Sequence, residues 1–254
     1  MINRRQEKIS GICISTAGMV DTEKGSIFYS APLIPNYAGT QLKKTLEEKF
    51  HIPCEVENDV NCAGLAECRS GAAKGSSVAL VLTIGTGIGG CIVLDGKVFH
   101  GFSNSACEVG YMHMGSSDFQ TLGAASILTK KVAEWKCDPQ EKWDGYHIFE
   151  EAKKGDKTCL QAIDEMTDVL GKGIANICYV INPEIVVLGG GIMAQEDFLK
   201  ERIECALKNI LYPALKNIQK LHLRSIRMMQ VCWEHSIISV VRTKKDRIIL
   251  WNTM

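Results

Sequence analysis

The pattern of apolar and polar positions along the chain shows two kinds of segment, one typical of strands and one typical of helices. Short apolar runs bounded by turn residues predict strands, and apolar residues that recur every three to four positions predict helices. In the segment 40–50, Leu42, Leu46 and Phe50 follow the helical period. Strands are expected at 9–15, 26–30, 52–56, 77–84, 91–95 and 185–188, and helices at 40–50, 60–73, 121–135, 146–152, 157–180 and 196–211. Strands that alternate with helices indicate an α/β protein.

Composition narrows the class of partner. The 254 residues are 46% hydrophobic, which is enough for one large core or two modest ones. The 29 basic and 29 acidic residues are mixed along the chain, so neither nucleic acid nor a membrane surface is expected as a partner. No apolar stretch is long enough to span a membrane, and residues 1–8 do not resemble a secretory signal. We therefore expect a cytoplasmic protein with a small-molecule partner.

The 11 cysteines do not form a metal-binding pattern, because no C-x-C or C-x-x-C pair occurs. Most of them lie inside apolar segments, where a thiol behaves as a small buried hydrophobe. The sequence predicts neither a disulfide framework nor a metal site.

Glu57-Asn58-Asp59 joins a predicted strand to a predicted helix. The carboxyl end of a strand is where open α/β sheets bind ligands, so Asp59 is a candidate acid-base residue. Asn58 or Asp59 could instead cap the following helix, since both residue types are favoured there. Capping and catalysis are compatible at such a junction.

The segment 82–90 is rich in glycine, and Gly85, Gly87 and Gly90 match G-x-G-x-x-G. A dinucleotide fingerprint must open a helix, whereas here another strand follows. We interpret the segment as a hairpin whose backbone amides, with the hydroxyls of Thr83 and Thr86, could hold a phosphate. The alternative is a plain glycine-rich hairpin. A carboxylate followed by a phosphate cradle indicates phosphoryl transfer.

Two further segments can each be given either a structural or a functional interpretation. Glu108 is either a surface carboxylate or a buried one that hydrogen-bonds sugar hydroxyls. Gly189-Gly190-Gly191 is either a strand-to-helix turn or a backbone that a nucleotide can approach closely.

These motifs, in this order and spacing, resemble the ROK family of bacterial sugar kinases and sugar-responsive repressors. The resemblance is carried by 57–63, 82–90, 107–112 and 181–191, and it covers roughly residues 9–220. It implies an actin-like ATPase (ribonuclease H-like) fold of two α/β domains, the first of them incomplete. The expected division is 1–68 for the remnant of the first domain, 69–220 for the second and 221–254 for a tail outside the family.

The resemblance implies an ATP-dependent kinase for a hexose or amino sugar, with Mg²⁺ carried by ATP and a homodimer as the common assembly. It assigns Asp59 as the general base. It also implies two sets of binding residues. The sugar is bound by Asn36, Asn58, Asp59, Glu108 and Tyr111, and ATP is bound by Thr83, Gly85, Thr86, Gly87, Gly189, Gly190 and Gly191. The alternative is a sugar-binding sensor without catalysis; residues 1–10 leave no room for a DNA-binding helix-turn-helix.

Two features depart from the family pattern. The Asp-x-Gly-Gly-Thr phosphate loop of the family kinases is absent. Tyr111 stands where many members have a histidine, and residues 116–120 continue without the cysteines of a zinc loop. The chain therefore resembles the zinc-free branch, which includes glucokinase-like, β-glucoside and N-acetylmannosamine kinases, and no zinc is expected.

The third departure is the tail from about Leu221. Read from the third base of each codon, Met228 to Gln230 encode Asp-Ala and Cys232 to Glu234 encode Leu-Gly, whatever synonymous codons are used. Permitted choices extend this to Asn-Asp-Ala-Gly-Met-Leu-Gly-Ala, which resembles the closing motif of the family. We hypothesise a frameshift between about Gln219 and Arg227, which sequencing of that stretch of the gene would test. The loss of a final helix would leave apolar core exposed and the fold marginal.

Overall fold

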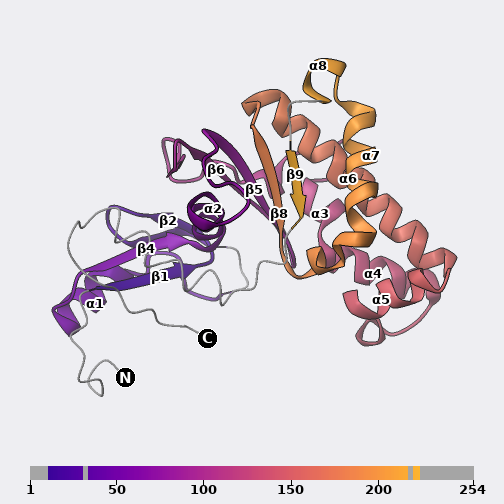
Figure 1. Cartoon of the computed structure of the whole chain (residues 1–254). Coiled ribbons are helices and arrows are strands. Elements are labelled where there is room, and N and C mark those ends of the chain that lie inside the picture. The colour runs from indigo at the N-terminus through magenta and orange to yellow at the C-terminus, as the bar shows by residue number, and fades with distance from the viewer. Residues whose placement is uncertain (1–10, 31–33, 217–219, 224–254) are drawn as a thin grey trace.

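The described part of the molecule is organised by a larger sheet of five strands, a smaller parallel sheet of two strands, and a third sheet that is a two-stranded hairpin (Figure 1). The structure is a computed structural model that describes residues 11–30, 34–216 and 220–223. Residues 224–254 of the proposed tail and most of the proposed frameshift region lie outside these residues, whereas 220–223 are described as a strand. The described part has the α/β actin-like ATPase architecture expected from the sequence.

The smaller sheet pairs β1 (Ile12–Thr16) with β4 (Cys54–Asn58) in parallel, with Thr16 opposite Asn58. A hairpin of β2 (Met19–Asp21) and β3 (Ser26–Tyr29) and helix α1 (Leu42–Phe50) lie beside it. A small core of buried side chains holds these elements together: Ile12, Val20, Ile27, Cys54 and Val56.

The larger sheet has five strands in the order β7-β6-β5-β8-β9. Its strands are β5 (Val78–Ile84), β6 (Ile88–Leu94), β7 (Lys97–Val98), β8 (Ile185–Gly189) and β9 (Lys220–Leu223). β8 runs parallel to both β5 and β9, whereas β5 and β6 form an antiparallel hairpin. The hairpin rules out a dinucleotide fingerprint at the glycines, as predicted.

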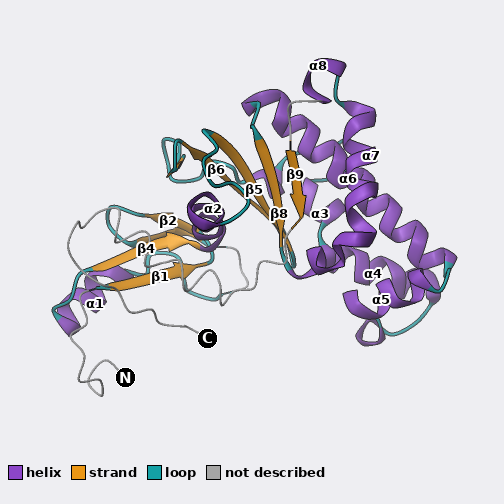
Figure 2. Cartoon of the chain, viewed as in Figure 1, coloured by secondary structure: helices purple, strands orange, loops and turns teal. Residues whose placement is uncertain are grey.

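Helices cover both faces of the larger sheet (Figure 2). α2 (Asp59–Ser70) lies on the face toward the smaller sheet. The other face carries α3 (Phe119–Gly123), α4 (Ala125–Lys136), α5 (Gly145–Lys153), α6 (Lys157–Ile181) and α7 (Glu196–Ile210), with α8 (Pro213–Lys216) after them. Short 3-10 helices occur at Val109–Tyr111, Gln140–Lys142 and Gly191–Gln195.

Strand β5 shows why the sequence folds into these layers. Its side chains alternate between the two faces because a strand has a period of two. Ala79 and Val81 belong to the cluster toward α2, and Leu80, Leu82 and Ile84 belong to the large core under α4 to α7. Both faces are apolar, so the strand reads as one continuous hydrophobic run.

The predicted elements are present, with three differences. β6 begins at Ile88 rather than at 91, because the turn takes only Gly85 to Gly87. The helix expected over 121–135 is broken at Ala124, which has an extended backbone and separates α3 from α4. Strands β2, β7 and β9 were not predicted; each has four residues or fewer and depends on pairing with a neighbour.

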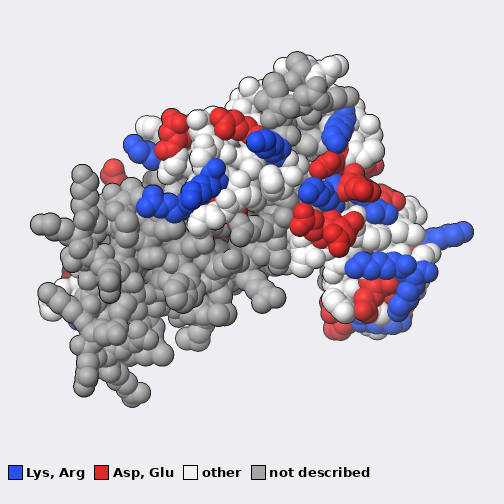
Figure 3. Space-filling model, in the orientation of Figure 1, with Lys and Arg blue, Asp and Glu red and all other residues white. Residues whose placement is uncertain are grey.

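Surface and core properties agree with the composition. On the face drawn in Figure 3, acidic and basic side chains intermingle over the helical part. Ion pairs between helices include Lys131 with Glu165 at 2.8 Å. Six of the cysteines within the described ranges are buried, as expected for small hydrophobes. In the same ranges, no helix is long and apolar enough to cross a membrane.

Candidate functional site

A cavity of about 700 Å³ lies where strands of both sheets end. β4 reaches it with Asn58 and β5 with Ile84, and the residues after β1 and β8 line it as well. The carboxyl ends of parallel strands are the usual ligand site in open α/β sheets. The volume falls in the range of small-molecule sites, about 300–1,000 Å³.

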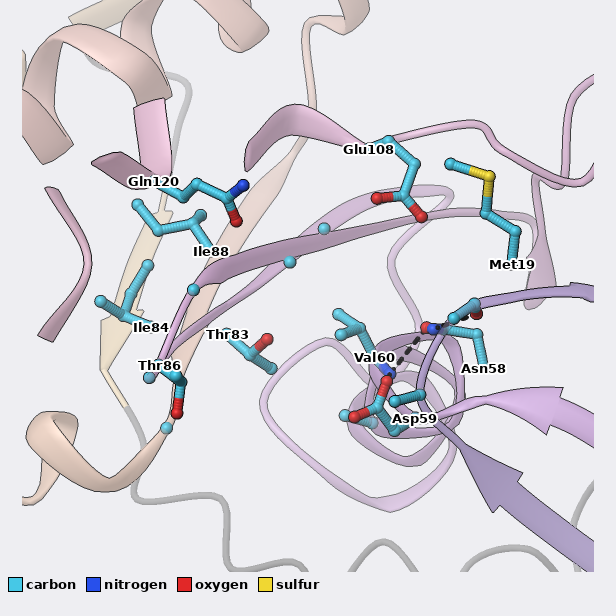
Figure 4. Close-up of a pocket in the computed structure, with 18 of the residues that line it drawn as sticks. Met19, Asn58, Asp59, Val60, Thr83, Ile84, Thr86, Ile88, Glu108 and Gln120 are labelled. Carbon is cyan, nitrogen blue, oxygen red and sulfur yellow. Dashed lines mark hydrogen bonds between the residues drawn. The ribbon is translucent and has the colours of Figure 1, made fainter. Parts of the chain in front are cut away.

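The junction of β4 and α2 combines capping with a carboxylate in the cavity. The Asn58 side chain is the N-cap of α2, accepting from the backbone N–H groups of Val60 at 2.8 Å and Asn61 at 3.1 Å. Its amide nitrogen donates to the Gly18 carbonyl at 3.0 Å. Asp59 is the first helical residue and lines the cavity (Figure 4). Asn58 is thus the capping residue, which leaves Asp59 available for chemistry.

Two carboxylates face each other across the cavity (Figure 4). Burial raises the pKa of Asp59, although hydrogen bonds from Val60 and its own backbone partly oppose the shift. Burial, followed by the negative charge of Asp59, raises the pKa of Glu108. Glu108 is nonetheless an exposed residue on the cavity wall, so of the two interpretations of this residue the structure agrees with the surface carboxylate. The pair forms an acidic site open to solvent on the Glu108 side.

The glycine turn forms another wall of the cavity. Gly85 donates its N–H to the Gly87 carbonyl at 2.9 Å, and Thr83, Gly85, Thr86 and Gly87 all line the cavity. A Cβ on Gly85 would meet nothing within 4 Å, so its backbone is open to a ligand. Backbone amides in such a turn can bind an anion.

Gly89 and Gly90 have a different role, because they lie within β6. A Cβ on Gly89 would come within 2.6 Å of Val60 Cγ2, and one on Gly90 within 2.6 Å of Cys107 Sγ. These glycines therefore allow α2 and the loop before Glu108 to approach β6 closely.

A second cavity of about 400 Å³ adjoins the first and shares Gly85, Thr86 and Gly191 with it. The hydroxyl of Ser126, which also lines it, donates to the Thr86 carbonyl at 2.7 Å. The remaining lining residues come mainly from α4, α5 and the segment after β8, among them Thr129, Tyr146, Phe149 and Ile192. Together the cavities form one elongated space with the glycine turn at its middle.

The three glycines after β8 differ in position. Gly189 is buried within the strand and lines neither of these cavities, whereas Gly190 and Gly191 do line them. Gly190 has φ of +109°, and a Cβ there would lie 2.2 Å from the Ile84 carbonyl oxygen. Only glycine fits this close approach of β8 to the hairpin.

Tyr111 lines the larger cavity, but Asn36 does not. Asn36 lies in an exposed loop with φ of +58°. Sequence reasoning missed further lining residues, among them Met19, Tyr29, Ile34 and Gln120. Gln120 and Tyr29 are polar neighbours of the Tyr111 hydroxyl and both influence its pKa. Their contribution depends on tertiary packing, and no local motif marks them.

Within 11–30, 34–216 and 220–223, no group of three or more histidine, cysteine, aspartate or glutamate side chains is arranged to hold a metal ion.

Comparisons with known proteins show which family the chain belongs to. The model of the ROK family matches residues 1–228, which extends beyond the range expected from the motifs at both ends. Uncharacterized protein CPE0188 of Clostridium perfringens is 50% identical over 213 residues, 84% of this chain and 72% of the relative. The glucokinase of Halalkalibacterium halodurans is 30% identical over 224 residues, 80% of this chain and 67% of the relative.

A solved structure of the same family has a similar fold. A ROK family protein from Streptococcus pneumoniae TIGR4, in complex with sucrose, superposes with a TM-score of 0.83 and 26% identity, covering 94% of this chain and 83% of that one. With a family match over most of its length and sugar kinases at about 30% identity among its relatives, this chain belongs to the ROK family.

Proposed function

We propose that the chain transfers the γ-phosphoryl group of ATP to a hydroxyl of a hexose or amino sugar. The observation that carries the proposal is the position of the Asp59 carboxylate, which shares one cavity with the glycine turn Gly85 to Gly87. A kinase needs the carboxylate and the phosphate-binding turn close enough to contact bound sugar and ATP at the same time, because the acceptor hydroxyl must meet the γ-phosphate in line. The relationship to the Halalkalibacterium halodurans glucokinase supports a sugar as the acceptor.

The two adjoining cavities have a shape suited to ATP. Its phosphates would lie at the shared residues Gly85, Thr86 and Gly191, where a Cβ added to either glycine would meet nothing within 4 Å. The adenosine would enter the second cavity beside Tyr146, whose exposed aromatic ring offers flat apolar surface. Among the described residues, no lysine or arginine lines either cavity. Mg²⁺ bound with ATP would supply the positive charge that phosphoryl transfer requires.

Side chains of the protein carry out the remaining steps of the reaction. Asp59, when ionised, accepts the proton of the sugar hydroxyl as its oxygen forms a bond to the γ-phosphorus. The bond from that phosphorus to the bridging oxygen breaks, and ADP leaves. Asn58 and Glu108 would orient the sugar by hydrogen bonds to its other hydroxyls.

The test is ADP production by the full chain with ATP, Mg²⁺ and a panel of sugars. The panel contains glucose, mannose, fructose, N-acetylglucosamine, N-acetylmannosamine and a β-glucoside. Turnover with at least one sugar, abolished in Asp59→Asn, is the expected result. A folded sample that binds ATP and sugar without turnover would contradict the proposal.

A second candidate is a sugar-binding sensor that does not catalyse transfer. The absence of cationic side chains around both cavities, within the part of the chain that the structure describes, favours it. Sugar binding that is unaffected by ATP, together with no ADP production, would support this candidate.

A further inference from the structure

The second cavity, which is proposed to hold the adenosine, offers an uncovered aromatic ring and apolar walls. The ring of Tyr146 lines it and is 66% exposed. Glu150, one turn further along α5, is the polar neighbour of the Tyr146 hydroxyl and raises its pKa. Two other lining side chains, Phe149 and Ile192, are buried and apolar. Such surfaces bind the face of any nucleobase, because every base has an aromatic face.

The polar side chains near that ring are already hydrogen-bonded within the protein. The Ser126 hydroxyl donates to the Thr86 carbonyl at 2.7 Å, and the Thr129 hydroxyl donates to the Ser126 carbonyl at 2.9 Å. The side-chain oxygen of Gln195 accepts from the Lys153 ammonium at 2.7 Å. A base that makes no bond to these three lining side chains therefore leaves none of them without a partner.

Strong selection between bases needs a polar group that one base pairs and another leaves unpaired. Sites built in that way reject the wrong substrate by about 10,000-fold or more. Here the hydroxyl oxygens of Ser126 and Thr129 can only accept further bonds, and the amide nitrogen of Gln195 can only donate. Adenine and guanine each carry an amino group that donates and a ring nitrogen that accepts, so both purines suit these groups.

Backbone groups at the helix starts lead to the same conclusion. Ala125 begins α4, and Gly145 and Tyr146 begin α5. The N–H groups in the first turn of a helix have no acceptor within it, so these residues offer donors to a ligand. Adenine and guanine share the ring nitrogens N3 and N7 as acceptors. Among the described residues that line this cavity, none of the groups named here is complementary to adenine alone.

We propose that the donor site accepts purine nucleoside triphosphates without selecting between adenine and guanine. The base lies against the ring of Tyr146, and the phosphates lie at the glycine turn. Pyrimidines bind more weakly, because a single ring covers less of the tyrosine. The inference rests on the proposed function, since it names the class of phosphoryl donor for the same site.

The experiment measures binding to the full chain by calorimetry with Mg²⁺. The ligands are the non-hydrolysable β,γ-imido analogues of ATP, GTP, CTP and UTP. We expect the two purine analogues to bind within about tenfold of each other, and both pyrimidine analogues to bind more weakly than either. A larger difference between the purine analogues, in either direction, would overturn the inference.

Four variants locate the contact with the base. Tyr146→Ala should weaken both purine analogues by about tenfold and to the same extent, whereas Tyr146→Phe, which keeps the ring, should retain their affinity. Phe28→Ala is the matched control, since Phe28 is 65% exposed and lines neither of the two cavities. Gln195→Ala should keep the ratio of the two purine affinities. A ratio that changes about tenfold in this variant would show that Gln195 reads the base, and would overturn the inference.

Sugar phosphate formation with each triphosphate separates the inference from the proposed function. Product formed with ATP but not with GTP overturns the inference and leaves the kinase standing. Similar binding of the two purine analogues, with no product from any triphosphate and any sugar of the panel, supports the donor class and contradicts the kinase. No binding of any analogue contradicts both.

Discussion

Glu57 at the end of β4 lies 2.7 Å, measured from its Oε2, from Nε2 of His100 in the loop after β7. The carboxylate is buried, and its other oxygen accepts from the Asn58 N–H at 2.8 Å and from the Asn61 side chain at 3.0 Å. The carbonyl of His100 accepts from Ala106 N–H at 3.1 Å, closing the loop that leads to Glu108. The pair therefore connects the strand that carries Asp59 to the loop that carries Glu108.

Replacement of His100 by alanine should weaken sugar binding. Without the imidazole, the loop that carries Glu108 loses its attachment to Glu57, and a hydrogen bond to a charged group is worth about 1.5–3 kcal/mol. We expect the KM for sugar to rise about tenfold, with the KM for ATP unchanged. His100→Gln, whose amide can donate to Glu57, should restore most of the affinity. Equal changes in both KM values would indicate general destabilisation instead.

Asp59→Asn should abolish transfer and keep sugar binding. A general base contributes typically about 100-fold to 10,000-fold, and asparagine cannot accept the proton. Steady-state ADP production should therefore fall by at least 100-fold while calorimetry still detects the sugar. Wild-type turnover in this variant would assign the base to another group.

The same variant should be more stable than the wild type at neutral pH. Because burial raises the pKa of Asp59, the folded state favours the protonated carboxyl. The resulting stability is fully present below the ordinary aspartate pKa of about 3.9 and is lost as the pH rises through the raised value. Thermal unfolding should give a higher Tm for Asp59→Asn at about pH 7.5 and no difference below about pH 4.

Asp168→Asn is the control for this measurement, because Asp168 is an exposed carboxylate on α6 that does not line the cavity. Its Tm should follow that of the wild type at both pH values. A lower Tm for Asp59→Asn at neutral pH would contradict the role assigned to burial.

Gly190→Ala should destabilise the fold. The added Cβ would lie 2.2 Å from the Ile84 carbonyl oxygen at a residue with φ of +109°. Backbone strain and overpacking each cost about 1–3 kcal/mol, which lowers Tm by roughly 5 °C or more in a chain of this size. Gly191→Ala is the matched control, since its Cβ would meet nothing within 4 Å. Equal Tm values for the two variants would refute the steric argument.

Local patterns predicted most of the elements and the two motifs nearest the chemistry. The hairpin at Gly85 to Gly87 follows from strand signals on both sides, and the strand-to-helix junction at Asp59 follows from a change of hydrophobic period. Gly189 shows the limit of motif reading. It is buried in β8, so of the three consecutive glycines, only Gly190 and Gly191 face the cavities.

The sequence by itself determined the α/β class, the resemblance to the ROK family and the carboxylate at Asp59, because these depend on neighbouring residues and on fixed spacings. Tertiary structure decided which distant segments meet. Glu57 and His100, or Tyr29 and Tyr111, are brought together only when the two sheets pack around α2. Such contacts join residues far apart in the chain, so local propensity and periodicity cannot predict them.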